Sequence, residues 1–105
     1  MAKYKLAYLH SAEIDILEIV RFHAGQVGPA SARDVYRSIR EQIGRLQDFP
    51  MLGPLHPDPE LAVLGYRKLV LTKTYVAVYR IIDDVVMVYR VVNGKTDYPK
   101  LLRAC

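Results

Sequence analysis

The stretch from residue 65 to residue 102 constrains the fold most, because it holds three β-rich segments in succession. We predict strands near 66–71, 75–82 and 85–92, each dense in the Val, Ile and Tyr that favour a pleated, half-buried surface. Asp83-Asp84 reads as a tight hairpin turn, and Asn93-Gly94 supplies residues that tolerate positive φ. The stretch therefore predicts an antiparallel meander.

Side-chain alternation along the second and third of these strands places Arg80 and Arg90 on otherwise aliphatic faces. The two predicted faces are Val76, Val78, Arg80 and Ile82 on one strand, and Val86, Val88 and Arg90 on the next. A sheet with one wet face tolerates such arginines at its rim. A sheet that binds an anionic partner would display them.

The N-terminal part begins with a predicted strand over about 3–9, followed by a helix over about 11–25. Ser11 resembles a helix N-cap, and acids in the next turn suit the helix dipole. The apolar positions that repeat at helical spacing are Ile14, Leu17 and Val20, flanked by Ile16, Ile19 and Phe22, and we expect this face to pack on the sheet.

A second helix is predicted over about 29–48, because Pro29 fits a first helical turn and apolar residues again recur at helical spacing. Its apolar face comprises Ala32, Val35, Tyr36, Ile39, Ile43 and Leu46. Residues 50–64 contain four of the six prolines and are predicted to form an irregular crossing.

The resulting order is β-α-α-β-β-β with a short tail over 97–105. It predicts an α+β fold in which a helical hairpin packs on one face of an antiparallel sheet. At 105 residues a single domain over 1–105 is expected.

Composition narrows the class of protein. Hydrophobic residues make up 51% and charged residues 25% of the chain, as in globular domains. No apolar run approaches the roughly 20 residues that span a bilayer, and no signal peptide is evident, so we expect a cytoplasmic protein without a membrane partner. The single Cys105 offers neither a disulfide nor a zinc cluster, and we expect no metal or cofactor.

Net charge is +4 but unevenly distributed. Residues 65–105 carry eight Lys and Arg against three Asp, a balance of +5, whereas residues 1–64 carry seven basic and eight acidic residues, a balance of −1. The asymmetry suggests an anionic partner for the sheet, either nucleic acid or an acidic protein segment. A basic surface without such a partner is the alternative.

Motifs for nucleotide, metal or nucleophilic chemistry are absent, and His10, His23 and His56 are scattered enough to be incidental surface or capping residues. The basic and aromatic side chains of the sheet remain. Because cations bind phosphates and aromatic rings stack on bases, we predict a target- or phosphate-binding surface there. Its members are Arg67, Lys68, Arg80, Arg90 and Lys95, with Tyr98 as the aromatic residue.

The geometric expectation is that Arg67 and Arg90 approach one edge of the sheet, and that Lys95 and Tyr98 fold back over it. Arg80 has a second interpretation as a structural residue bonded to the tail. Catalytic residues are unknown; candidates for metal-independent RNA cleavage are Arg67, Lys68, Lys95 and Tyr98.

Four sequence segments together resemble the RelE/ParE superfamily of bacterial toxins from type II toxin–antitoxin modules, and the resemblance covers essentially the whole chain. They are the LxxFPxxGP motif from Leu46 to Pro54, the Tyr-Arg pairs at Tyr66-Arg67 and Tyr79-Arg80, and the RVVNGKxDY segment that ends at Tyr98. The resemblance implies a growth-inhibiting toxin of a plasmid-stabilisation module, bound in a hetero-oligomer by a cognate antitoxin.

The resemblance leaves the target open between DNA gyrase and the ribosome with its mRNA. RelE-like ribonucleases use a set of Lys, Arg and Tyr residues, and aligned positions here carry Arg67, Leu69, Val76, Thr96 and Leu102. Four of these five lack the needed chemistry, although a register slip would let Lys95 and Tyr98 substitute. The chain is therefore more similar to the ParE branch, whose members poison gyrase without cleaving RNA. A ribosome-dependent endoribonuclease and a non-toxic antitoxin-binding relative are the alternatives.

Overall fold

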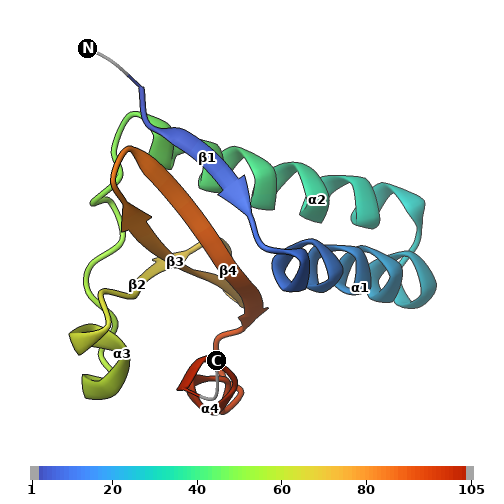
Figure 1. Ribbon diagram of the computed structural model, residues 1–105. Coiled ribbons are helices and arrows are strands. Elements are labelled where there is room, and N and C mark those ends of the chain that lie inside the picture. Colours follow the sequence, from blue (N-terminus) through green and yellow to red (C-terminus); the bar gives the residue numbers. More distant parts are fainter. Residues whose placement is uncertain (1–2, 104–105) are drawn as a thin grey trace.

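The computed structural model describes residues 3–103 and shows a helical hairpin beside a twisted four-stranded sheet (Figure 1). The elements in chain order are β1 (Lys5–Tyr8), α1 (His10–Gln26), α2 (Pro29–Gly44), η1 (Arg45–Gln47), α3 (Pro59–Val63), β2 (Arg67–Val70), β3 (Tyr75–Ile82), β4 (Val85–Asn93) and α4 (Pro99–Arg103). The predicted α+β class and the helix-on-sheet arrangement are confirmed. Cys105 lies outside the described residues.

The sheet has the strand order β1-β4-β3-β2. The meander of β2, β3 and β4 is antiparallel, as predicted, and Asp83 in the β3–β4 turn has a φ of 56°. The prediction of a wholly antiparallel sheet is wrong for one pair, because β1 runs parallel to β4. The crossover through α1 and α2 makes this direction possible, since parallel neighbours need a long connection.

The main core lies between the sheet and the helical hairpin. Ile39 and Ile43 of α2 and Leu46 of η1 are fully buried, as predicted for the second helix, but Tyr36 of the same predicted face is 45% exposed. The face predicted for the first helix is correct for Val20, which packs against the main core, and wrong for Ile14 and Leu17, which are 40% and 48% exposed. The buried positions of α1 are Ala12, Asp15 and Ile16.

A β-bulge corrects the predicted faces of β4. Val78 of β3 is opposite Arg90, whereas the next residue, Tyr79, is opposite Val88, so β4 holds one extra residue between them. Beyond the bulge the alternation changes phase. Val91 therefore joins the helix-facing core, although strict alternation placed it on the opposite face.

The sheet face opposite the hairpin carries a second cluster, covered by α3 and α4. The predicted irregular crossing contains α3. Its N-cap residue is Asp58, whose side chain accepts hydrogen bonds from the backbone N–H groups of Glu60 and Leu61. Leu61 of α3 and Leu102 of α4 are buried with Tyr66, Val76, Val78 and Tyr98. Within residues 3–103 no helix has the length and apolar character to cross a membrane.

Candidate functional site

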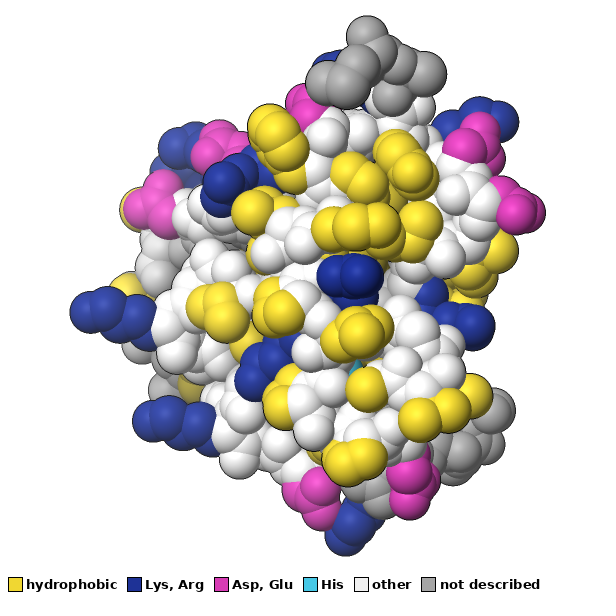
Figure 2. Space-filling model, turned by 90° about the vertical axis from the view of Figure 1, so that its left-hand side faces the viewer, with side chains coloured by type: hydrophobic (Ala, Val, Ile, Leu, Met, Phe, Trp, Pro, Cys, Tyr) yellow, Lys and Arg dark blue, Asp and Glu magenta, His cyan; other side chains and the backbone are white. Residues whose placement is uncertain are grey.

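The side of the molecule that carries the 50–64 link and α3 combines apolar and basic side chains. Figure 2 shows hydrophobic side chains spread over this side, with Lys and Arg between them and Asp and Glu at its margins. Such a surface suits recognition of an anionic partner that also buries apolar groups.

Arg80 is oriented by two tyrosine rings on the sheet face opposite the hairpin. Its guanidinium carbon lies 5.3 Å from the centre of the Tyr66 ring and 5.9 Å from that of Tyr89, and Nη1 donates to the Tyr89 hydroxyl at 3.3 Å. The two rings pack edge to face with centres 5.0 Å apart. Lys68, opposite Val78 in the sheet, lies on the same face. Cation–π contacts thus fix the Arg80 side chain on the sheet face that also carries Lys68.

Arg67 lies on the other face of β2 and forms a hydrogen bond within the protein. Its Nη1 donates to the Gly53 carbonyl at 2.9 Å. The Tyr79 hydroxyl, opposite it in the sheet, accepts from the Gly53 N–H at 3.0 Å and donates to the Pro50 carbonyl at 2.7 Å. Burial raises the pKa of this hydroxyl. Arg67 and Tyr79 together anchor the link to the sheet.

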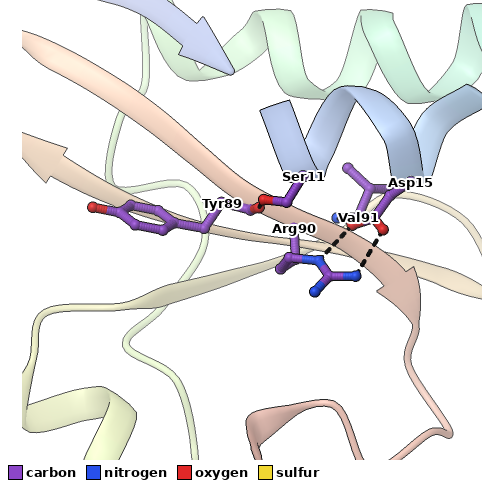
Figure 3. Close-up of polar contacts among 5 residues, drawn as sticks. All are labelled: Ser11, Asp15, Tyr89, Arg90 and Val91. Atoms are coloured by element: carbon purple, nitrogen blue, oxygen red, sulfur yellow. Dashed lines mark hydrogen bonds and ion pairs between the residues drawn. The ribbon is translucent and has the colours of Figure 1, made fainter. Parts of the chain in front are cut away.

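Arg90 forms a bidentate ion pair with Asp15 of α1, with both nitrogen–oxygen distances at 2.8 Å (Figure 3). Arg67 on β2 and Arg90 on β4 are separated by β3, so they do not share one edge. Lys95 is exposed in the turn after β4. Tyr98 is only 5% exposed. The structure therefore places Lys68 and Arg80 on the same sheet face and the other predicted residues elsewhere.

Two side chains of α1 complete the hydrogen bonding of the β4 bulge, as Figure 3 shows. Ser11 Oγ donates to the Tyr89 carbonyl at 2.8 Å, and Asp15 Oδ2 accepts from the Val91 N–H at 3.0 Å. β1 pairs with β4 only as far as Val88, and one turn of helix then serves the next backbone groups. The predicted N-cap role of Ser11 is wrong, because helix α1 begins one residue earlier and the hydroxyl is engaged by β4.

His56 joins the link to the C-terminal tail and is buried, contrary to the expectation of an incidental residue. Its Nδ1 accepts from the Asp58 N–H at 3.0 Å, so in the neutral ring Nε2 carries the proton and donates to the Tyr98 hydroxyl at 2.7 Å. Burial and the Lys68 ammonium lower the pKa of His56, against an opposing effect of Asp58. The surroundings of His56 therefore favour its neutral imidazole form.

We expect the free energy of unfolding to fall as pH drops below about 6.5, the ordinary pKa of histidine. The unfolded chain binds a proton there that folded His56 resists, so the native state loses stability down to the lowered pKa. Urea unfolding between pH 7.5 and 5 measures the slope. His56→Asn is the control, because its amide oxygen can still accept from Asp58 and does not titrate. An equal slope in both proteins would contradict the assignment.

A second surface lies on the helical hairpin. Ile14, Leu17 and Val20 of α1 line a groove of about 340 Å³ with Tyr36 and Arg40 of α2. Arg40 makes a bidentate contact with Glu13 at 3.1 and 3.2 Å, and its guanidinium carbon lies 4.5 Å from the centre of the Tyr8 ring. The side chains predicted to face the core thus line an open apolar groove.

Sequence reasoning missed the structural roles of Asp15 and His56. For Asp15 a signal existed, because Ser11 and Asp15 are four residues apart and so share one face of a helix. For His56 none existed, since its partner Tyr98 is 42 residues away. No group of three His, Cys, Asp or Glu within residues 3–103 is arranged to hold a metal ion.

The comparison with family models identifies one family. Residues 6–98 match the family described as "ParE toxin of type II toxin-antitoxin system, parDE". No curated protein matches the sequence significantly.

Among solved structures, the chain resembles the chromosomal ParDE toxin–antitoxin system from P. aeruginosa, with a TM-score of 0.74 and 24% identity over 87% of this chain and 96% of that one. It also resembles the toxin–antitoxin complex RelBE2 from Mycobacterium tuberculosis, with a TM-score of 0.58 and 23% identity over 91% and 97%. A YoeB/ParE toxin from Agrobacterium tumefaciens gives a TM-score of 0.54 and 19% identity over 86% and 98%. At these identities the structural likenesses show the fold alone.

Proposed function

Because the chain belongs to the ParE toxin family of type II toxin–antitoxin systems, we propose that it inhibits growth by binding DNA gyrase as a protein target. In this proposal the toxin acts in the cytoplasm without a cofactor, and it stabilises the plasmid or locus that encodes it. A cognate antitoxin neutralises it in a hetero-oligomer.

The observation that favours gyrase over RNA is the burial of three positions aligned with the catalytic set of RelE-like ribonucleases. Leu69, Val76 and Leu102 are 7%, 5% and 2% exposed and belong to the two hydrophobic clusters. Apolar side chains inside a core offer neither a proton-transfer group nor a phosphate clamp. This argument supports a toxin that acts by binding.

We place the contact with the target on the face that holds Lys68 and Arg80. Neither side chain forms an ion pair with a carboxylate within residues 3–103, and Arg80 is held in place by Tyr66 and Tyr89. Ordering a long cation before binding lowers the entropy lost on association. Lys95 remains a further candidate at the other end of the meander.

Expression in cells distinguishes the targets. Gyrase poisoning predicts induction of the DNA-damage response and cleaved supercoiled DNA, whereas ribonuclease action predicts arrested translation and transcripts cut at codon positions. Lys68→Ala should reduce toxicity while the melting temperature stays nearly constant, because surface substitutions usually change stability by about 0.5 kcal/mol or less. Lys73→Ala, in the exposed β2–β3 turn, is the matched control. Transcript cleavage without DNA damage would replace gyrase by the ribosome as the target.

The antitoxin is proposed to lie across the helical hairpin and the free edge of β1. The hairpin groove is apolar and contains the exposed Ile14 and Leu17, and β1 is an edge strand beside it. Grooves of this kind accept amphipathic helices, and sheet edges accept extended segments. An acidic antitoxin would also suit the net charge of +4.

Leu17→Asp should abolish co-purification with the product of the adjacent reading frame, because it puts a charge in the apolar groove. The fold should be retained, since Leu17 is 48% exposed. Val63→Asp, at an 86% exposed position on α3, should leave the complex intact. Pull-down from co-expressing cells measures both. Equal capture of the two variants would remove the hairpin groove from the antitoxin interface.

A further inference from the structure

A second groove lies between the 50–64 link and β2, on the side of the molecule shown in Figure 2. Its volume is about 560 Å³. Leu52, Leu55 and Val70 line it and are 38%, 52% and 62% exposed. These side chains contribute neither to the main core nor to the second cluster. The groove is therefore an apolar surface that the fold itself leaves uncovered.

The outer edge of β2 is covered by the link along only part of its length. The Lys68 N–H donates to the Pro54 carbonyl at 3.0 Å, whereas the Leu71 N–H donates to Tyr75 on the β3 side. Alternation therefore turns the backbone N–H and C=O of Val70 outward, as for Lys68. On the N-terminal side of Pro54 the link turns away from this edge, because the Gly53 N–H donates to the Tyr79 hydroxyl. An open position on an edge strand can pair with an extended segment.

The charges at the rim of this groove have one sign. Arg45 and Lys68 line it, and among residues 3–103 no Asp or Glu does. The Arg45 Nη1 donates to Gln42 at 2.9 Å, and neither Arg45 nor Lys68 pairs with a carboxylate within residues 3–103. An occupant with carboxylates beside apolar side chains would complement both the rim and the floor of the groove.

We propose that this groove docks an acidic, extended segment of the toxin's protein target. The segment would pair its backbone with Val70, place apolar side chains against Leu52 and Leu55, and set carboxylates beside Arg45 and Lys68. A second copy of this chain is a poor occupant because its net charge is +4. Nucleic acid is also poorly matched, since none of the described residues that line the groove has an aromatic ring for base stacking. The inference rests on the proposed function, in which the target is a protein.

The first experiment titrates the full chain, labelled with ¹⁵N, with a synthetic ten-residue peptide that alternates Leu and Glu. The matched peptide alternates Leu and Lys. We expect the acidic peptide to bind at least tenfold more tightly at low salt, with amide shifts centred on Leu52, Leu55 and Val70. Equal binding of the two peptides, or shifts centred on the hairpin groove, would overturn the proposal.

Arg45→Glu tests the rim without touching Arg80 or the cores. The Arg45 side chain is exposed and donates a solvent-exposed hydrogen bond to the Gln42 side chain of α2, so the fold should be retained. Binding of the acidic peptide should weaken at least tenfold. Arg33→Glu, an exposed cation near the start of α2, makes the same charge change away from the groove and should change binding less than twofold. Unchanged binding in Arg45→Glu would overturn the docking site, as would a single-stranded oligonucleotide that displaces the peptide.

Toxicity assays separate this inference from the proposed function. If the inference holds, Arg45→Glu loses toxicity and Arg33→Glu retains it, while the wild-type chain still cleaves DNA through gyrase. Gyrase poisoning that survives Arg45→Glu would overturn the groove and leave the proposed function standing. If the purified chain binds the acidic peptide as predicted but expressing cells show transcript cleavage and no DNA damage, gyrase is not the target.

Discussion

Asp15→Ala is expected to lower the free energy of unfolding by about 3 kcal/mol, the size of effect seen when one partner of a buried ion pair is removed. Asp15 is 8% exposed, and its carboxylate accepts two hydrogen bonds from Arg90 and one from the Val91 N–H. The substitution would remove the Asp15 carboxylate from Arg90 and from the Val91 N–H of the bulge. Chemical denaturation measures the change.

The matched control is Glu13→Ala, two residues away on the same helix. Glu13 also pairs with an arginine, Arg40, but its side chain is 46% exposed, and exposed pairs contribute about 0–1 kcal/mol. Arg90→Ala combined with Asp15→Ala should cost less than the sum of the single changes, because each single change removes the same ion pair. If Asp15→Ala costs no more than Glu13→Ala, Asp15 does not hold α1 on β4.

Gly53→Ala is expected to destabilise the fold by about 2–3 kcal/mol through overpacking. A Cβ at this position would lie 2.6 Å from the Lys68 carbonyl oxygen and 3.0 Å from Cε1 of Tyr79. The first of these atoms is backbone, which cannot rotate away. Movement would also disturb the bonds from Gly53 to Tyr79 and Arg67.

Gly44→Ala provides the comparison, since a Cβ there meets nothing within 4 Å and the residue ends α2. That change should be neutral or stabilising by up to about 1 kcal/mol, because Ala favours helix more than Gly. Thermal or urea unfolding compares the two variants. Equal stabilities would mean that the link can move away from β2 without loss.

The sequence alone predicted the elements whose signals are local. Helical spacing located α1 and α2, turn residues located the β3–β4 hairpin, and their order predicted the α+β class. The resemblance also predicted the family, because the LxxFPxxGP motif and the Tyr-Arg pairs occur together. Those signals need no knowledge of distant neighbours. The short helix α3 was also locally encoded by Asp58 and Pro59, and its signal was overlooked.

Tertiary structure decided everything that depends on partners distant in sequence. The parallel β1–β4 pair, the bulge beside Arg90 and the rotation of α1 follow from contacts across 75 or more residues, such as those of Ser11 with Tyr89 and Asp15 with Arg90. Because one extra residue in β4 reverses the faces beyond it, alternation could not place Arg90, and the buried Tyr98 was not distinguishable from an exposed one. A sequence specifies which side chains are basic or aromatic, but only packing determines which of them remain free to meet a partner.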